Sequence, residues 1–119
     1  MPRVKTAVPS HARHKKVLAL TAGHRASRHK IYKRAHESMI HALSYAFFHR
    51  RERKGDMRRL WIARISALSR TNGVAYAQLM NGLKKAGIDI NRKMLADMAV
   101  REPQNFAALV EMTRGKEPS

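Results

Sequence analysis

The sequence contains no cysteine, which excludes disulfide bonds, thiolate nucleophiles and zinc sites ligated by cysteine. Acidic residues are scarce as well. Eight Asp and Glu stand against 25 Lys and Arg in 119 residues, which gives a formal net charge of +17. No apolar run approaches the roughly 20 residues that a membrane span needs, or the longer apolar centre of a signal peptide. We therefore expect neither a membrane segment nor a cleaved leader.

The positive charge is concentrated in the first half of the chain. Residues 1–59 carry 16 Lys and Arg against 3 acidic residues, and they hold all 7 histidines. Residues 60–119 carry 9 basic and 5 acidic residues. A half-chain with so much like charge repels itself, and a polyphosphate backbone is the usual partner that relieves the repulsion. The first half is therefore predicted to be a nucleic-acid-binding arm.

Helical patterns fill most of the chain and predict an all-α fold. Residues 1–10 contain two prolines and no periodicity, so we expect an extended lead, followed by a short basic helix over about 11–22. Gly23 is placed to end that helix in a left-handed conformation. From Ser27 to Asn72 there is no proline and one glycine, which predicts a single long helix over about 27–72.

This long helix is expected to bridge a basic arm, residues 1–58, and a small globular helical domain, residues 59–119. In the second part Gly87 predicts a helix end, Asn91 an N-cap and Pro103 the first residue of a last helix. The apolar residues on the predicted helix faces would close over Trp61 and Ile65. They are Tyr76, Leu79, Met80, Leu83, Met94, Leu95, Met98, Phe106, Leu109, Val110 and Met112.

The densest group of cations lies between residues 50 and 59, where six occur among ten residues. Because consecutive helical residues are about 100° apart, these side chains would surround the helix. That arrangement suits insertion between RNA helices better than contact along one groove. Glu52 and Asp56 are expected to pair with local arginines rather than to act as a catalytic pair. The predicted phosphate-binding residues here are Arg50, Arg51, Arg53, Lys54, Arg58 and Arg59.

Further cations on both sides of this group are predicted to contact RNA. Each phosphate contact displaces counterions, so the contributions of separate clusters accumulate. Four aromatic residues of the predicted long helix either stack on unpaired bases or pack on apolar neighbours, and the sequence leaves both alternatives open. They are Tyr32, Tyr45, Phe47 and Phe48. The additional predicted contacts in the arm are Arg3, Lys5, Arg13, His14, Lys15, Lys16, Arg25, Arg28, Lys30, Lys33 and Arg34. Those in the second part are Arg64, Lys84, Lys85, Arg92 and Lys93.

The sequence offers no candidate active site. It has no Gly-x-Ser-x-Gly elbow, no glycine-rich phosphate loop and no carboxylate pair set apart from bases. The close histidine pairs, His11 with His14 and His36 with His41, lack the i, i+4 spacing that places two metal ligands on one helix face. We therefore expect no enzyme, metal, cofactor or small-molecule substrate. The alternatives are a helix-based DNA-binding regulator, using helices between Tyr76 and Val100, and a basic enzyme that acts on nucleic acid.

Five segments together resemble the bacterial-type L20 family of large-subunit ribosomal proteins. They cover essentially the whole chain in the family's order, and the Arg-Arg-Leu-Trp-Ile and Asn-Gly-Leu-Lys-Lys-Ala blocks are quite specific. Two departures are local. His24 and Ala26 stand where the family tends to have Tyr and Gly, and Gly55-Asp56-Met57 replaces a more basic stretch. The matching segments are residues 1–5, 13–18, 58–65, 81–86 and 92–97.

The resemblance implies a structural constituent of the large ribosomal subunit that binds 23S-type rRNA directly and acts early in assembly. Its partners would be that rRNA and neighbouring ribosomal proteins, in the bacterial cytoplasm or inside an organelle. In some members the C-terminal domain also binds the protein's own messenger and represses its translation. By this likeness the RNA contacts would include Arg13, His14, Lys15, Lys16, Arg50, Arg51, Arg53, Lys54, Arg58, Arg59 and Arg64.

Overall fold

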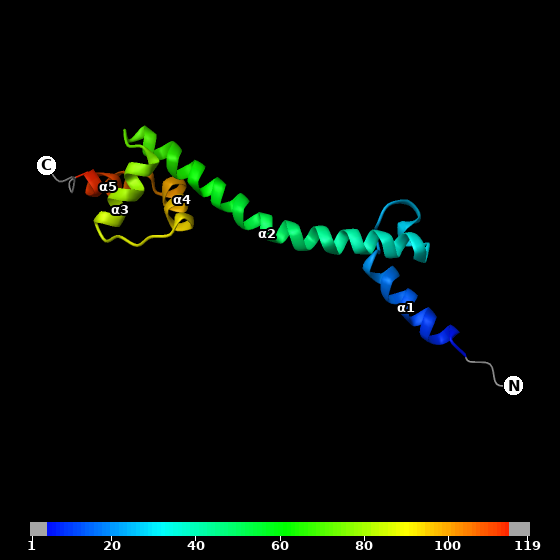
Figure 1. Ribbon diagram of the computed structural model, residues 1–119. Coiled ribbons are helices and arrows are strands. Elements are labelled where there is room, and N and C mark those ends of the chain that lie inside the picture. The colour runs from blue at the N-terminus through cyan, green and yellow to red at the C-terminus, as the bar shows by residue number, and fades with distance from the viewer. Residues whose placement is uncertain (1–4, 115–119) are drawn as a thin grey trace. The chain divides into compact units, whose positions relative to one another are not determined.

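A computed structural model describes residues 5–114, and the predicted contact Arg3 lies outside them. The described residues form helices joined by turns, without a strand, which confirms the all-α prediction (Figure 1). Five are α-helices and one is a short 3₁₀ helix. They are α1 (Ala7–Leu20), η1 (Ala26–His29), α2 (Tyr32–Thr71), α3 (Tyr76–Lys85), α4 (Arg92–Arg101) and α5 (Pro103–Arg114).

The first helix begins earlier than predicted. Residues 7–10 were expected to be extended, but they form the first turn of α1 and include Pro9. Proline is tolerated there because the first four N–H groups of a helix have no intrahelical acceptor. The helix ends at Leu20, two residues before the predicted end, and Gly23 adopts a left-handed φ of 85°, as predicted.

The long helix begins later than predicted. Residues 26–29 form η1, and α2 starts only at Tyr32. The amides of Lys30 and Ile31 both donate to the carbonyl oxygen of Ser27, which closes the turn before α2 begins. No proline or glycine marks this break, so the residue pattern does not reveal it. From Tyr32 the helix continues through Gly55 to Thr71.

The chain divides into two compact units, unit 1 up to Arg51 and unit 2 from Glu52 onward. Unit 1 has a small interior in which Val17, Thr21 and Ala35 are buried. The hydroxyl of Thr21 donates to the carbonyl oxygens of Val17 and Leu18, each at 3.3 Å. Three small buried side chains leave most of this unit's surface to cations and exposed aromatic rings.

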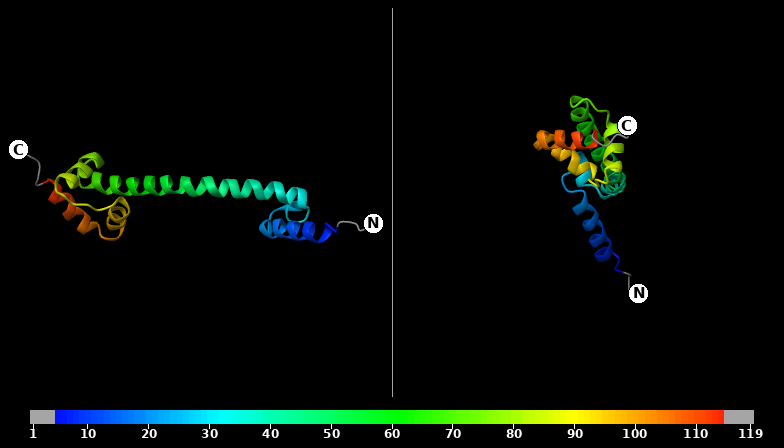
Figure 2. Two further views of the ribbon diagram at one scale, coloured as in Figure 1. Left: turned by 60° about the horizontal axis from the view of Figure 1, so that its bottom comes forward. Right: turned by 90° about the vertical axis from the view of Figure 1, so that its left-hand side faces the viewer.

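Unit 2 contains the main hydrophobic core. Helices α3, α4 and α5 gather beside the C-terminal part of α2 in each view (Figures 1 and 2). Met94 and Met112, predicted to face the core, are instead 60% and 62% exposed, because they lie on the outward sides of α4 and α5. The buried core residues are Ile65, Val74, Leu79, Leu83, Leu95, Ala96, Ala99, Phe106 and Val110.

Hydrogen bonds fix the helix ends of unit 2. The Oδ1 atom of Asn91 accepts from the amide of Met94 at 2.9 Å, which confirms the predicted N-cap. Pro103 is the first residue of α5, as predicted. After α2, the buried Ser69 hydroxyl donates to the Val74 carbonyl oxygen at 2.7 Å. At the end of α5, Arg114 donates to the carbonyl oxygen of Asn72 at 2.6 Å. These bonds hold α3 and α5 at the end of α2.

Candidate nucleic-acid interface

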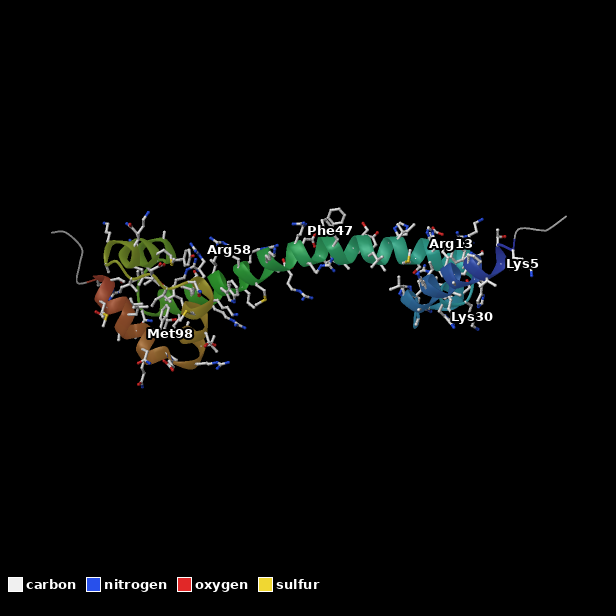
Figure 3. The ribbon with its side chains drawn as sticks, turned by 90° about the horizontal axis from the view of Figure 1, so that it is seen from below. Lys5, Arg13, Lys30, Phe47, Arg58 and Met98 are labelled. Carbon is white, nitrogen blue, oxygen red and sulfur yellow. The ribbon has the colours of Figure 1, made fainter. Side chains whose placement is uncertain are left out.

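The predicted cations lie on the surfaces of both units. Of the predicted contact residues that the structure describes, all are exposed except His14 and Arg92, which are half-buried. Figure 3 shows Lys5, Arg13 and Lys30 in unit 1, and Arg58 on α2. Charged side chains that remain in water keep their nitrogen atoms available to phosphate oxygens. The surface is therefore suited to a polyanion.

The six cations between residues 50 and 59 are all exposed. Arg59 donates to Asp56 at 2.8 Å, which confirms one of the two predicted acid–arginine pairs. Among the residues the structure describes, Glu52 forms no ion pair, so the other prediction is wrong. Both members of the Asp56–Arg59 pair are mostly exposed, and such pairs contribute little to stability. Arg59 is therefore free to exchange this partner for a phosphate.

The aromatic residues of α2 differ in their surroundings. Tyr32 packs within unit 1, where its ring stacks on that of His14. Tyr45, Phe47 and Phe48 are 58%, 45% and 56% exposed. The guanidinium of Arg51 lies 4.4 Å from the centroid of the Phe47 ring, which projects from α2 in Figure 3. Exposed rings beside cations are typical of surfaces that stack on nucleobases.

In unit 1 a recess of about 340 Å³ brings two predicted cations together. Arg28 comes from η1 and Arg34 from the first turns of α2. The sequence did not single out Glu37 and Ser38 as members of a site, nor group them with His41 and Tyr45. Glu37 and Ser38 lie three to four positions before His41, and Tyr45 lies four positions after it, which places these residues on one face of a helix. This spacing is the sequence signal that could have indicated the site. We name this site the Glu37 recess; its lining residues are Arg28, Arg34, Glu37, Ser38, His41 and Tyr45.

Unit 2 has two grooves lined in part by predicted cations. Lys84 and Arg92 line the first, of about 660 Å³, between α3 and the start of α4. Nε of Arg92 donates to the hydroxyl of Tyr76 at 2.9 Å, which explains why this side chain is half-buried.

Arg64 and Lys93 line the second groove of unit 2, of about 580 Å³, together with Trp61 and Arg101. The sequence assigned Trp61 to the core and missed Arg101 altogether. Arg101 pairs with Asp97 at 2.9 Å. Lys85 is exposed and lines neither groove.

Two histidines of unit 1, His24 and His29, serve local structure. Within the described range, no group of three or more His, Cys, Asp or Glu residues is arranged to hold a metal ion. Nδ1 of His24 shares a hydrogen bond of 2.7 Å with the Ser38 hydroxyl, and Nδ1 of His29 donates to the His24 carbonyl oxygen at 2.7 Å. Over the same residues, no helix is both long and apolar enough to cross a membrane.

A helical fold, a strongly basic surface and grooves lined by cations define a class of structural, polyanion-associated proteins.

Residues 3–109 match the ribosomal protein L20 family. The chain is 65% identical over 109 residues to the large ribosomal subunit protein bL20 of Dehalococcoides mccartyi strain 195, which covers 92% of each chain. It is 53% identical over 116 residues to that of Moorella thermoacetica, covering 98% of this chain and 96% of the relative.

The chain belongs to the ribosomal protein L20 family. This confirms the resemblance seen in the sequence. Members of the family are structural components of the large ribosomal subunit and not enzymes, so the protein is a ribosome-bound constituent of that subunit in the cytoplasm. As part of a ribonucleoprotein it is associated with the subunit's rRNA and proteins.

Proposed function

We propose that the protein binds large-subunit rRNA directly, through an arm over residues 1–58 and a docking domain over residues 59–119. The observation that carries this proposal is the distribution of charge, with 16 of the 25 Lys and Arg residues in the first 59 residues, 15 of which lie in the described range and are exposed. Each cation that meets a phosphate releases condensed counterions, which favours binding and lowers the repulsion between RNA helices that approach each other. The contact residues predicted from the sequence are the proposed binding residues.

The two parts contribute differently to this binding. The arm supplies mainly phosphate contacts, which position the protein on RNA without reading its sequence. In the docking domain the cations line grooves beside apolar and amide side chains such as Trp61 and Asn91. Grooves of that composition favour a defined RNA shape. We therefore assign affinity chiefly to the arm and selection of the RNA site chiefly to the domain.

An early role in subunit assembly accompanies this binding. Phosphate neutralisation is most useful before RNA helices have approached each other, because the repulsion is then still to be overcome. Depletion of the protein is expected to leave large-subunit precursors that sediment more slowly, with normal small subunits. Normal large-subunit profiles after depletion would contradict the assembly role.

Repression of the protein's own messenger is a second proposed role, taken from the resemblance and assigned to the grooves of unit 2. If messenger and rRNA use the same grooves, they compete, and repression rises only when free rRNA is exhausted. A reporter carrying the messenger's leader should then be repressed by added protein and relieved by added rRNA fragment. A protein altered at Lys84 and Arg92 should lose this repression.

The direct test is binding of the full-length protein to transcribed large-subunit rRNA fragments at several salt concentrations. Between 50 and 200 mM salt the affinity should fall by about 1,000-fold or more, as expected for six or more phosphate contacts. Replacing Arg13, Lys15 and Lys16 by Gln should lower the slope of log affinity against log salt by about 2 to 3. A slope near zero, or a preference for duplex DNA in direct competition, would contradict direct rRNA binding and favour the alternatives considered from the sequence.

A further inference from the structure

The Glu37 recess has an unusual charge arrangement for a unit that binds polyanions. Glu37 is the only acidic residue among the first 51 residues, which contain 12 Lys and Arg. Arg28 and Arg34 line the same recess, yet within residues 5–114 no ion pair or side-chain hydrogen bond engages Glu37. A carboxylate weakens nonspecific phosphate binding nearby. Its position in a recess with unpaired oxygen atoms points to a specific hydrogen-bond donor as its partner.

The same recess also offers aromatic surfaces. The ring centroids of His41 and Tyr45 lie 6.1 Å apart, with 25° between the ring planes. The ring centroids of Tyr45 and His49 lie 5.9 Å apart, with 10° between the planes. These three rings form a ladder along α2, and all three side chains are exposed. Stacking on an aromatic ring is the common way in which proteins hold an unpaired base. The ladder therefore presents a surface on which a base can lie beside Glu37.

The segment over residues 24–29, which supplies Arg28 to the recess, is held against α2 by specific bonds. His24 is bonded to Ser38, which lines the recess, and His29 is bonded to the carbonyl of His24. Ala26, two residues before Arg28, has a φ of 60°. A left-handed conformation costs an alanine about 1 kcal/mol, so the surrounding contacts must impose it. This strained turn places Arg28 at the recess.

We propose that the Glu37 recess takes one unpaired guanine nucleotide of an RNA strand. The base stacks on Tyr45 and His41. Its Watson–Crick edge donates to Glu37. The flanking phosphates contact Arg28 and Arg34. The inference rests on the proposed RNA binding and extends it by naming a base that the protein reads.

Guanine follows from the hydrogen-bonding capacity of the carboxylate. Both oxygens of Glu37 accept and neither donates when the group is ionised. Among the four RNA bases, only guanine presents two adjacent donors, N1–H and N2–H, on its Watson–Crick edge, and these match the two oxygens of one carboxylate. Adenine and cytosine each present one donor beside an acceptor, and uracil presents one donor between two acceptors. Each of these three bases therefore places an acceptor against the carboxylate.

The test uses the full-length protein and a set of RNA hairpins that differ only in one bulged nucleotide. All members carry the same number of phosphates, so the counterion contribution to affinity is equal at one salt concentration. The guanine bulge should bind about 10-fold more tightly than the adenine bulge, the discrimination typical of a bidentate pair. An inosine bulge, which lacks the N2 amino group, should lose most of that advantage. Equal affinities for all four bulges would overturn the proposal.

Three variants separate base reading from charge and from loss of fold. Glu37→Gln should abolish the guanine preference, whereas Glu52→Gln, the same change of charge at an exposed position outside the recess, should keep it. Tyr45→Leu should weaken binding of every bulged hairpin by about 10-fold. Circular dichroism of each variant should show unchanged helical content. Retention of the preference in Glu37→Gln would contradict the assignment.

Two further outcomes distinguish the inference from the proposed function. Steep salt dependence on rRNA fragments without any preference for bulged guanine would leave direct rRNA binding intact and remove only the guanine site. Free guanosine monophosphate, added in competition, should not displace the hairpin at micromolar concentrations, because it carries only one of the two flanking phosphates. Displacement at such concentrations would identify a free nucleotide, rather than RNA, as the occupant and would overturn the proposal.

Discussion

The imidazole ring of His14 lies flat against the phenol ring of Tyr32, with ring centroids 3.7 Å apart and planes inclined by 14°. This contact joins α1 to the first residue of α2 within unit 1. Helix α1 has 14 residues and no side-chain cap at its N-terminus, and isolated helices of that length are marginal in water. The stack is therefore one of the few tertiary contacts that keep α1 folded.

Replacement of His14 by Ala should destabilise α1 by about 1 kcal/mol, the contribution typical of an aromatic pair. His14→Phe retains a flat ring and should preserve most of the stability. Hydrogen exchange of the α1 amides, measured by NMR, should be faster in the alanine variant only. Equal exchange rates in His14→Ala and the parent protein would show that the stack does not support the helix.

Two helical glycines should respond to alanine in opposite directions. A Cβ atom on Gly82 would lie 2.8 Å from Cβ of Thr113, whereas one on Gly55 would meet nothing within 4 Å. Gly82→Ala should therefore separate α3 from α5 and cost about 1 to 3 kcal/mol. Gly55→Ala should raise stability by up to about 1 kcal/mol through its higher helix propensity. Thermal unfolding followed by circular dichroism at 222 nm measures both changes, and a stabilising Gly82→Ala would contradict the close packing.

The turn before α2 should be stabilised by glycine. Ala26 has a φ of 60°, and relief of that left-handed strain by Ala26→Gly should gain about 1 kcal/mol. Ala42→Gly, at an exposed position away from the ends of α2, serves as the control and should lower stability by about 1 kcal/mol. Protection of the Ala35 amide against exchange should increase in the first variant and decrease in the second. A loss of protection in both would mean that Ala26 is not strained.

The cap of α4 offers a further prediction. Because Oδ1 of Asn91 accepts from the Met94 amide, Asn91→Ala should destabilise unit 2 by about 1 kcal/mol. Asn91→Ser retains an acceptor oxygen and should be nearly neutral. Midpoints of urea unfolding give both differences directly. An alanine variant as stable as the serine variant would show that the cap bond contributes nothing.

The sequence was sufficient to predict features governed by local chemistry. Asn91 capped α4 and Pro103 opened α5, because capping and proline preferences depend on neighbours along the chain. The buried residues Ile65 and Phe106 also followed from helical spacing. Most of the core of unit 2 was therefore readable from periodicity alone.

Features that depend on contacts distant in sequence were missed. The turn before Tyr32 is tied to α2 by the bond between His24 and Ser38, 14 residues apart, and no breaking residue signals where α2 starts. The same approach of turn and helix creates the Glu37 recess, so the sequence did not single out Glu37. Its isolation among cations was visible in the sequence, but its recess was not.

The bond from Arg114 to the Asn72 carbonyl joins residues 42 positions apart in sequence, and Val110 and Thr113 are buried close to it. During synthesis, unit 2 therefore has to wait for the last turn of α5 before its interior can close. Unit 1 emerges first and has no need of that turn. The order of translation thus allows the basic half to meet nascent RNA while the other half is still unfolded, since domains generally fold as separate units from the N-terminus onward.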